Sequence, residues 1–306
     1  MFSADPDRRG FLMGSSALGV TTALGAIAAM VSSSTASAAN AAEARPARRM
    51  PVIFIGHGSP MNAIRDNTFT RRLTAWGRAL PVPTAILSVS AHWLTQGGTG
   101  VSIQERPETI HDFGGFPQAL FDVQYPAPGH VALAREAASL VRQTQVLTTT
   151  GWGLDHGSWT VLKFLYPKAD VPVFQMSIDY GQPAAFHHAV GRDLAALRDK
   201  GVLILGSGNV VHNLRATDRG AADSVMATRP WAQSFDDAAK SALQGRDDKA
   251  LIDYAKLPGA ETAVATPDHY YPLLYALGAA GANEPAQTIY EGFQAGTLSM
   301  RCLQFG

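Results

Sequence analysis

The sequence predicts an α/β protein, a single domain with a central, largely parallel sheet flanked by helices. Short apolar runs suited to buried strands alternate along the chain with helical segments. Several of these runs are continuous rather than alternating, which is typical of strands buried on both faces. No internal repeat or linker interrupts residues 50–306, so one domain is the simplest division.

Composition supports a folded protein with a substantial core. The chain has 306 residues, of which 46% are hydrophobic and 16% charged, as in globular domains rather than disordered chains. Lys+Arg and Asp+Glu both total 25, so the formal net charge is zero and we expect no nucleic-acid partner. The one cysteine, Cys302, excludes an internal disulfide and a CxxC metal site, and we expect it to be buried and structural.

Residues 1–49 read as a leader outside the fold. Arg8 and Arg9 precede Phe-Leu and a mildly apolar, Ala/Gly-rich stretch, which ends before an Ala-Ser-Ala segment at 36–38. Paired arginines, an apolar region and a small-residue cleavage site are typical of a twin-arginine signal peptide. Three glycines interrupt the stretch, which weakens the alternative of a retained membrane anchor. The sequence therefore predicts export to the periplasm or beyond through the twin-arginine machinery, with no stable membrane anchor after cleavage.

The first half of the folded region begins with a strand. An apolar run predicts this strand at 52–55, and a helix follows at 68–80, where Pro81 ends it. A second apolar run predicts a strand at 85–89. Residues 105–128 are rich in proline, glycine and aromatic residues and predict a long surface loop. Loops of this length are often functional.

The second half continues the alternation of helices and strands. We expect helices at 129–144, at 158–166 with Ser158 as the N-cap, at 182–200 closed by Gly201, in segments up to 257, and at 266–281. We expect strands at 171–178 and 202–205. Two short runs at 288–291 and 298–304 predict a terminal hairpin.

Five of the nine histidines occupy positions that suggest a common site. His57, His92 and His212 each follow an apolar run, His156 lies in a glycine-rich loop, and His269 opens a helix after Pro-Asp. Open α/β sheets bind ligands at the carboxyl ends of their strands, so these side chains are expected to converge. Because neutral imidazole is the commonest metal ligand near neutral pH, we predict a metal site, although its ligands form no compact motif such as HExxH.

The remaining histidines are expected to be ordinary polar residues: His111, His130, His187 and His188. The last two are adjacent on a helix and point about 100° apart, which does not suit one metal. Three familiar nucleotide or hydrolase motifs are also missing from the sequence. Gly206-Ser207-Gly208 lacks the third glycine of a dinucleotide loop, and the chain has neither a GxSxG elbow nor a P-loop.

The histidine segments carry a family resemblance. They are Gly56-His57-Gly58-Ser59-Pro60, Ser90-Ala91-His92-Trp93, Asp155-His156-Gly157-Ser158-Trp159, Gly206-Ser207-Gly208-Asn209-Val210-Val211-His212-Asn213, and Pro267-Asp268-His269-Tyr270-Tyr271-Pro272-Leu273-Leu274. Together, and in this order over residues 51–305, they resemble the DOPA-dioxygenase type of extradiol aromatic ring-opening dioxygenases, which belong to the class III extradiol superfamily.

The resemblance implies roles for all five histidines. His57, His92 and His269 would bind one divalent metal per chain, iron(II) or zinc. His212 would be the catalytic acid/base, and His156 would line the substrate and oxygen pocket. The implied substrates are a catechol such as 3,4-dihydroxyphenylalanine, and dioxygen.

The chemistry suits these residue types but leaves two other functions open. A metal lowers the pKa of a catechol so that it binds as an anion, and a nearby histidine can take the second proton. Iron(II) with open positions can bind dioxygen. Three histidines suit zinc equally well, and zinc does no redox chemistry. The alternatives are a zinc-dependent hydrolase or amidase on the same scaffold, and a non-enzymatic periplasmic metal-binding protein.

The loop at 105–128 contains four aromatic residues that suit packing on a planar ring as well as on one another: Phe113, Phe116, Phe121 and Tyr125.

Overall fold

The computed structural model describes residues 49–217 and 227–306. Its strands are β1 (Val52–Gly56), β2 (Ala85–Thr95), β3 (Thr99–Ser102), β4 (Val146–Thr149), β5 (Val173–Asp179), β6 (Val202–Gly208), β7 (Gln287–Tyr290), β8 (Phe293–Gln294), β9 (Leu298–Ser299) and β10 (Cys302–Phe305). Eight of them form one sheet in the order β4-β3-β5-β2-β6-β1-β10-β7, and β8 pairs with β9. The predicted leader up to residue 48 lies outside the described residues.

The helices account for most of the remaining described residues. The α-helices are α1 (Thr68–Ala79), α2 (Gln118–Phe121), α3 (Val131–Leu140), α4 (His156–Leu165), α5 (Ala184–Leu194), α6 (Pro230–Gly245), α7 (Asp248–Ile252), α8 (Ala260–Ala263) and α9 (Tyr271–Ala279). The 3-10 turns are η1 (Pro60–Ile64), η2 (Ala195–Lys200), η3 (Leu214–Ala216), η5 (Tyr254–Lys256) and η6 (Pro267–His269).

The centre of the sheet is parallel, which confirms the predicted fold class. Strands β5, β2, β6 and β1 are neighbours and run in the same direction. Strand β3 is antiparallel to β5 on one side, and β10 is antiparallel to β1 on the other. The predicted pairing of the two C-terminal runs is confirmed by β7 and β10, which are antiparallel, but the run at 298–304 is divided, and its first part, β9, pairs with β8 instead.

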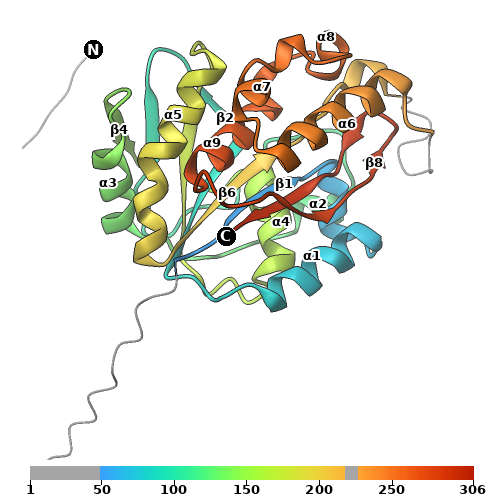
Figure 1. The fold of residues 1–306 in the computed structure, drawn as a ribbon. Coiled ribbons are helices and arrows are strands. Elements are labelled where there is room, and N and C mark those ends of the chain that lie inside the picture. The colour runs from blue at the N-terminus through green and yellow to red at the C-terminus, as the bar shows by residue number, and fades with distance from the viewer. Residues whose placement is uncertain (1–48, 218–226) are drawn as a thin grey trace, which may run out of the picture. The chain divides into compact units, whose positions relative to one another are not determined.

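Helices cover both faces of the sheet (Figure 1). In β1, Val52 and Phe54 pack in the core that contains residues of α3, α5, α6 and α9. Ile53 and Ile55 point to the opposite core, with residues of α1 and α4. Burial on both faces explains why this strand is a continuous apolar run rather than an alternating one.

The structure corrects several predicted boundaries. Strand β2 runs to Thr95, so His92 lies inside a strand rather than in a loop after it. Strands β3 and β4 were not expected, and the loop at 105–128 contains the short helix α2. Asp155, not Ser158, caps α4, because the Asp155 side chain accepts a hydrogen bond from the Ser158 backbone N–H. Gly201 closes η2 with φ +79°, as its position predicted.

Two glycines in β6 bring the chain around His269 against the sheet. A Cβ atom on Gly206 would lie 2.3 Å from the Pro272 carbonyl oxygen, and one on Gly208 would lie 2.1 Å from the His269 carbonyl oxygen. Both neighbours are backbone atoms, so a side chain would force the segments apart. The absence of side chains here lets η6 and α9 lie directly on β6, which fixes the backbone of His269 at the end of that strand.

Cys302 is fully buried in β10. Burial raises the pKa of its thiol to about 12, which confirms the expected structural cysteine rather than a reactive thiol. Within the described ranges, the structure contains no helix with the length and apolar character needed to span a membrane.

Candidate active site

Each of the five predicted histidines is placed by a different segment at one edge of the sheet. His57 directly follows β1, His92 lies near the end of β2, and His212 follows β6. His156 is the first residue of α4, and His269 is the last of η6. Since β1, β2 and β6 are parallel neighbours, their carboxyl ends meet, as the sequence predicted.

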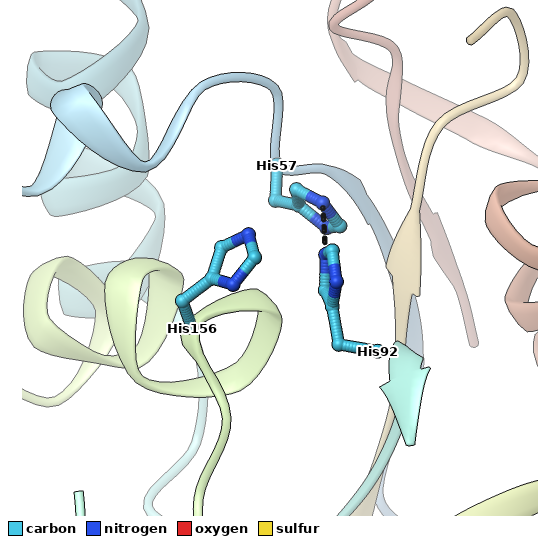
Figure 2. A group of neighbouring side chains, drawn as sticks. All are labelled: His57, His92 and His156. Carbon is cyan, nitrogen blue, oxygen red and sulfur yellow. Dashed lines mark hydrogen bonds between the residues drawn. The ribbon is translucent and has the colours of Figure 1, made fainter. Parts of the chain in front are cut away.

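The rings form one continuous cluster. The Nε2 atoms of His57 and His92 lie 3.2 Å apart, and Figure 2 shows the His156 ring beside both. Ring centroids are 3.8 Å apart for His92 and His156, and 5.8 Å for His57 and His156. The His269 ring lies 5.3 Å from that of His57 and 5.0 Å from that of His92. His212 stacks on His269 with 3.5 Å between centroids.

Two subsets of this cluster have donor atoms close enough to share an ion. Donor nitrogens of His57, His92 and His156 lie within 4.8 Å of one another. Donor atoms of His212, Asp268 and His269 do so as well. The three histidines that the resemblance assigned to the metal therefore span both subsets, with His269 joined to the other two by the ring contacts above.

A serine fixes the tautomer of His57. Ser207 Oγ lies 3.0 Å from His57 Nδ1, and it also donates to the Gly157 carbonyl oxygen at 2.5 Å. A hydroxyl has one proton, so Ser207 must accept from His57 Nδ1–H. The lone pair of the neutral ring is then on Nε2, the nitrogen that faces His92.

Two aspartates hold His156 and His269 in the same way. Asp112 Oδ2 lies 2.9 Å from His156 Nδ1, and Asp268 Oδ2 is hydrogen-bonded to His269 Nδ1. An ionised carboxylate only accepts, so each ring donates from Nδ1–H, and the neutral form of either ring has its lone pair on Nε2. Sequence reasoning singled out neither aspartate as functional, although it named Asp268 in a motif and identified the loop that carries Asp112.

Burial keeps three imidazoles of the cluster neutral, those of His57, His92 and His212. Burial, followed by the charges of His269 and His156, holds the pKa of His57 well below its usual range. The pKa of His92 is also held well below its usual range, mainly by burial and secondly by the charge of His156. For His212, burial and His269 lower the pKa to about 2 against the opposing charge of Asp268. Neutral imidazole is the form that binds metals and accepts protons.

The aspartates, in contrast, remain ionised. Burial alone would raise the pKa of Asp268, but the hydrogen bond and charge of His269 outweigh it and lower that pKa to about 2. Asp112 follows the same pattern, because the hydrogen bonds and charge of His156 outweigh burial and lower its pKa. The site thus combines the neutral rings of His57, His92 and His212 with carboxylates bonded to His156 and His269.

The other four histidines lie outside the cluster, as predicted. His111 Nε2 lies 3.0 Å from the Val123 carbonyl oxygen, and His130 caps α3. His187 is buried with Nδ1 3.2 Å from the Tyr275 hydroxyl. His188 Nε2 lies 3.5 Å from Asp248. These contacts are structural.

The loop aromatics divide into two groups. Phe113 lies edge-on to His156 with 5.4 Å between ring centroids, and it also contacts Phe116 and Phe121. Tyr125 is instead buried and donates its hydroxyl proton to the Tyr166 carbonyl oxygen. Of the four aromatics, Phe113 is therefore the one in ring contact with a histidine of the cluster.

Comparison with known proteins gives this cluster its context. The family described as the catalytic LigB subunit of aromatic ring-opening dioxygenase matches residues 51–300. The chain belongs to the LigB family. The LigB-family match covers all five histidines of the cluster, and it confirms the resemblance noted from the sequence motifs. The enzyme is accordingly an extradiol ring-opening dioxygenase, an oxidoreductase.

Individual relatives of this LigB-family chain agree. It is 51% identical over 262 residues to a protein of Escherichia coli (strain K12) named 4,5-DOPA dioxygenase extradiol, covering 84% of this chain and 95% of the relative. A Beta vulgaris protein of the same name is 38% identical, with 83% and 96% covered. A crystal structure of an uncharacterized Escherichia coli K12 protein is similar with a TM-score of 0.73 and 44% identity, covering 84% of this chain and all of the other.

Proposed function

We propose that this enzyme uses one divalent metal ion, iron(II) in the active form, to open the ring of a catechol similar to 3,4-dihydroxyphenylalanine with dioxygen. The observation that carries the proposal is the cluster of five imidazoles, with lone pairs fixed on Nε2 in three of them. The names of the two relatives above support the substrate class. The comparisons give no support to a hydrolase or to a non-enzymatic binding protein.

The spacing of two proposed donors, His57 and His92, fits a metal ion. Two imidazole nitrogens that bind a tetrahedral ion at about 2.0–2.1 Å are about 3.3 Å apart, and the Nε2 atoms of His57 and His92 are 3.2 Å apart. His57, His92 and His269 would hold the metal, with Ser207 and Asp268 orienting two of the rings from behind. Such partners are what metal-binding histidines require.

Bound iron(II) supplies redox chemistry and open positions for the catechol oxygens and dioxygen. The chain's own contribution is proton handling. His212 is neutral, so its ring can accept a proton from a catechol hydroxyl, and an anionic substrate beside it would raise its pKa towards the range of a useful base. Stacking on His269 holds the His212 ring next to the proposed metal ligands.

The test is anaerobic reconstitution of residues 50–306 with iron(II) or zinc. A catechol such as dihydroxyphenylalanine is then added with oxygen, and oxygen uptake and visible absorbance are followed. We expect uptake and a yellow ring-opened product with iron alone, and loss of both in His57→Ala and His212→Ala. Tight metal binding without uptake over a panel of catechols would overturn the proposal for those substrates.

We also propose that residues 1–49 direct export through the twin-arginine machinery. The support is the leader pattern of Arg8-Arg9 before Phe-Leu and an apolar stretch. In a host with this machinery, the processed chain should appear in the periplasm. Replacing both arginines by lysine should keep it inside the cell, and unchanged export of that double variant would argue against this route.

A further inference from the structure

Asp112, a carboxylate outside the proposed metal-ligand set, reaches the cluster from the long loop between β3 and α2. Its Oδ2 lies 2.9 Å from His156 Nδ1, and its Oδ1 accepts the His156 backbone N–H at 2.9 Å. Its side chain is 18% exposed, so these bonds are largely shielded from water. One carboxylate thus fixes both the ring and the backbone of His156.

This pairing sets what His156 offers to the site. Because the carboxylate only accepts, the proton of the neutral ring is on Nδ1 and Nε2 keeps a lone pair. Figure 2 shows the ring of His156 turned toward His57 and His92. His156 Nε2 is therefore a hydrogen-bond acceptor at the cluster. Asp112 gives it this property by keeping the ring proton on Nδ1.

The contact of Asp112 with His92 is of a different kind. Asp112 Oδ2 lies 3.6 Å from His92 Nδ1, which is too far for a hydrogen bond. Its effect on this proposed metal ligand is a charge interaction, whereas its effect on His156 is a pair of direct bonds. The two effects can therefore be separated by experiment.

We propose that Asp112 is a positioning residue for ring opening, which holds His156 so that its Nε2 accepts a hydrogen bond from a substrate hydroxyl. His156 then provides a second imidazole acceptor in addition to His212. The role toward substrate rests on the proposed function, but the tautomer of His156 does not depend on it.

The test compares Asp112→Asn with the unaltered enzyme. An amide can donate to His156 Nδ1, which favours the tautomer with the proton on Nε2. Long-range ¹H–¹⁵N spectra of the metal-free chain should show this change of tautomer. In the iron-loaded enzyme, kcat should fall about 10–100-fold, in the range seen for partners that orient site histidines, with little change in KM.

Two further variants guard against a trivial effect on folding. Asp112→Glu keeps the carboxylate and should restore the Nδ1–H tautomer and part of kcat. Asp122→Asn is the matched control, because Asp122 directly follows α2 and its carboxylate accepts from the Gln118 side chain. It should leave both readouts unchanged.

Three results would overturn the inference. One is an unchanged His156 tautomer in Asp112→Asn. Another is a fall in kcat on adding Asp112→Asn to the His156→Gln variant that is as large as the fall it causes in the unaltered enzyme. If Asp112 acts through His156, the effects of the two substitutions should not be additive. The third is a fall in zinc affinity of more than about tenfold, which would place the role of Asp112 on His92. If no catechol is turned over, the spectra still decide the tautomer, and that failure belongs to the proposed function.

Discussion

At the scale of single residues, each of three site histidines is oriented by an oxygen atom bonded to its Nδ1. Ser207 serves His57, Asp112 serves His156, and Asp268 serves His269. In every case the free lone pair is left on Nε2. Ser207 differs from the aspartates in being uncharged, so it orients His57 without adding negative charge next to that ring.

We predict that Ser207→Ala weakens metal binding about 10–100-fold. Without the hydroxyl, the Nδ1–H of the buried His57 has no acceptor, and the ring is free to change tautomer. Zinc affinity of the metal-free chain, measured by chelator competition, checks this. Ser88→Ala is the control, because Ser88 is also buried but bonds to Ser158 at 2.8 Å. Equal affinities for the two variants would contradict the role given to Ser207.

The oxygen partners also show where sequence reasoning stops. The five histidines were predictable as a group because each sits at a strand end or loop with a clear sequence signature. Asp112 lies 44 residues before His156, and Ser207 lies 150 residues after His57. These pairs are defined by the fold and not by chain spacing, so the sequence alone did not reveal them.

At the scale of elements, the strands and helices that form the core were the predictable ones. Strand β1 and helix α1 were found within one residue at each end because their apolar pattern and flanking signals are strong. Strand β4 was missed because it is a short edge strand that is partly exposed along its length, and so it lacks an apolar signature. The full length of β2 was missed because Ser90, His92 and Thr95 interrupt its apolar run.

Helices α5 and α9 are held together through glycines. A Cβ atom on Gly278 of α9 would lie 2.0 Å from the His188 carbonyl oxygen, and one on Gly191 of α5 would lie 2.3 Å from the Tyr275 carbonyl oxygen. These are contacts with backbone, which cannot move like a flexible side chain. The close approach of the two helices therefore depends on both glycines.

We predict that Gly278→Ala lowers the free energy of unfolding by about 1–3 kcal/mol or more, because the added methyl group forces α9 away from α5. Since η6 leads directly into α9, His269 should shift and metal affinity should fall as well. Urea unfolding and zinc titration measure the two effects. Gly245→Ala is the control, because a Cβ there meets no atom within 4 Å. A Gly278→Ala variant as stable as this control would refute the packing argument.

At the scale of the whole molecule, several buried histidines make the metal-free fold sensitive to acid. His57, His92, His187 and His212 all have pKa values lowered primarily by burial. In the unfolded chain they titrate near their ordinary pKa of about 6.5. Below that pH the unfolded state binds more protons than the native state, so acid favours unfolding. Bound metal would oppose this, because it binds the neutral rings of the native state.

His187 allows this effect to be measured away from the proposed metal. It is fully buried, and burial lowers its pKa to about 4. The neutral His187 ring therefore contributes fully to the free energy of unfolding above about pH 6.5. As the pH falls from there towards 4, the unfolded state gains a proton that the native state does not, and the free energy of unfolding falls by up to about 3 kcal/mol. We predict that the unfolding free energy of the metal-free chain declines over this window, and less steeply in His187→Gln, which has no titrating ring. Urea unfolding at a series of pH values gives both slopes. Parallel slopes would mean that the buried ring is protonated in the native state at little cost, and that acid sensitivity arises instead from the histidine cluster.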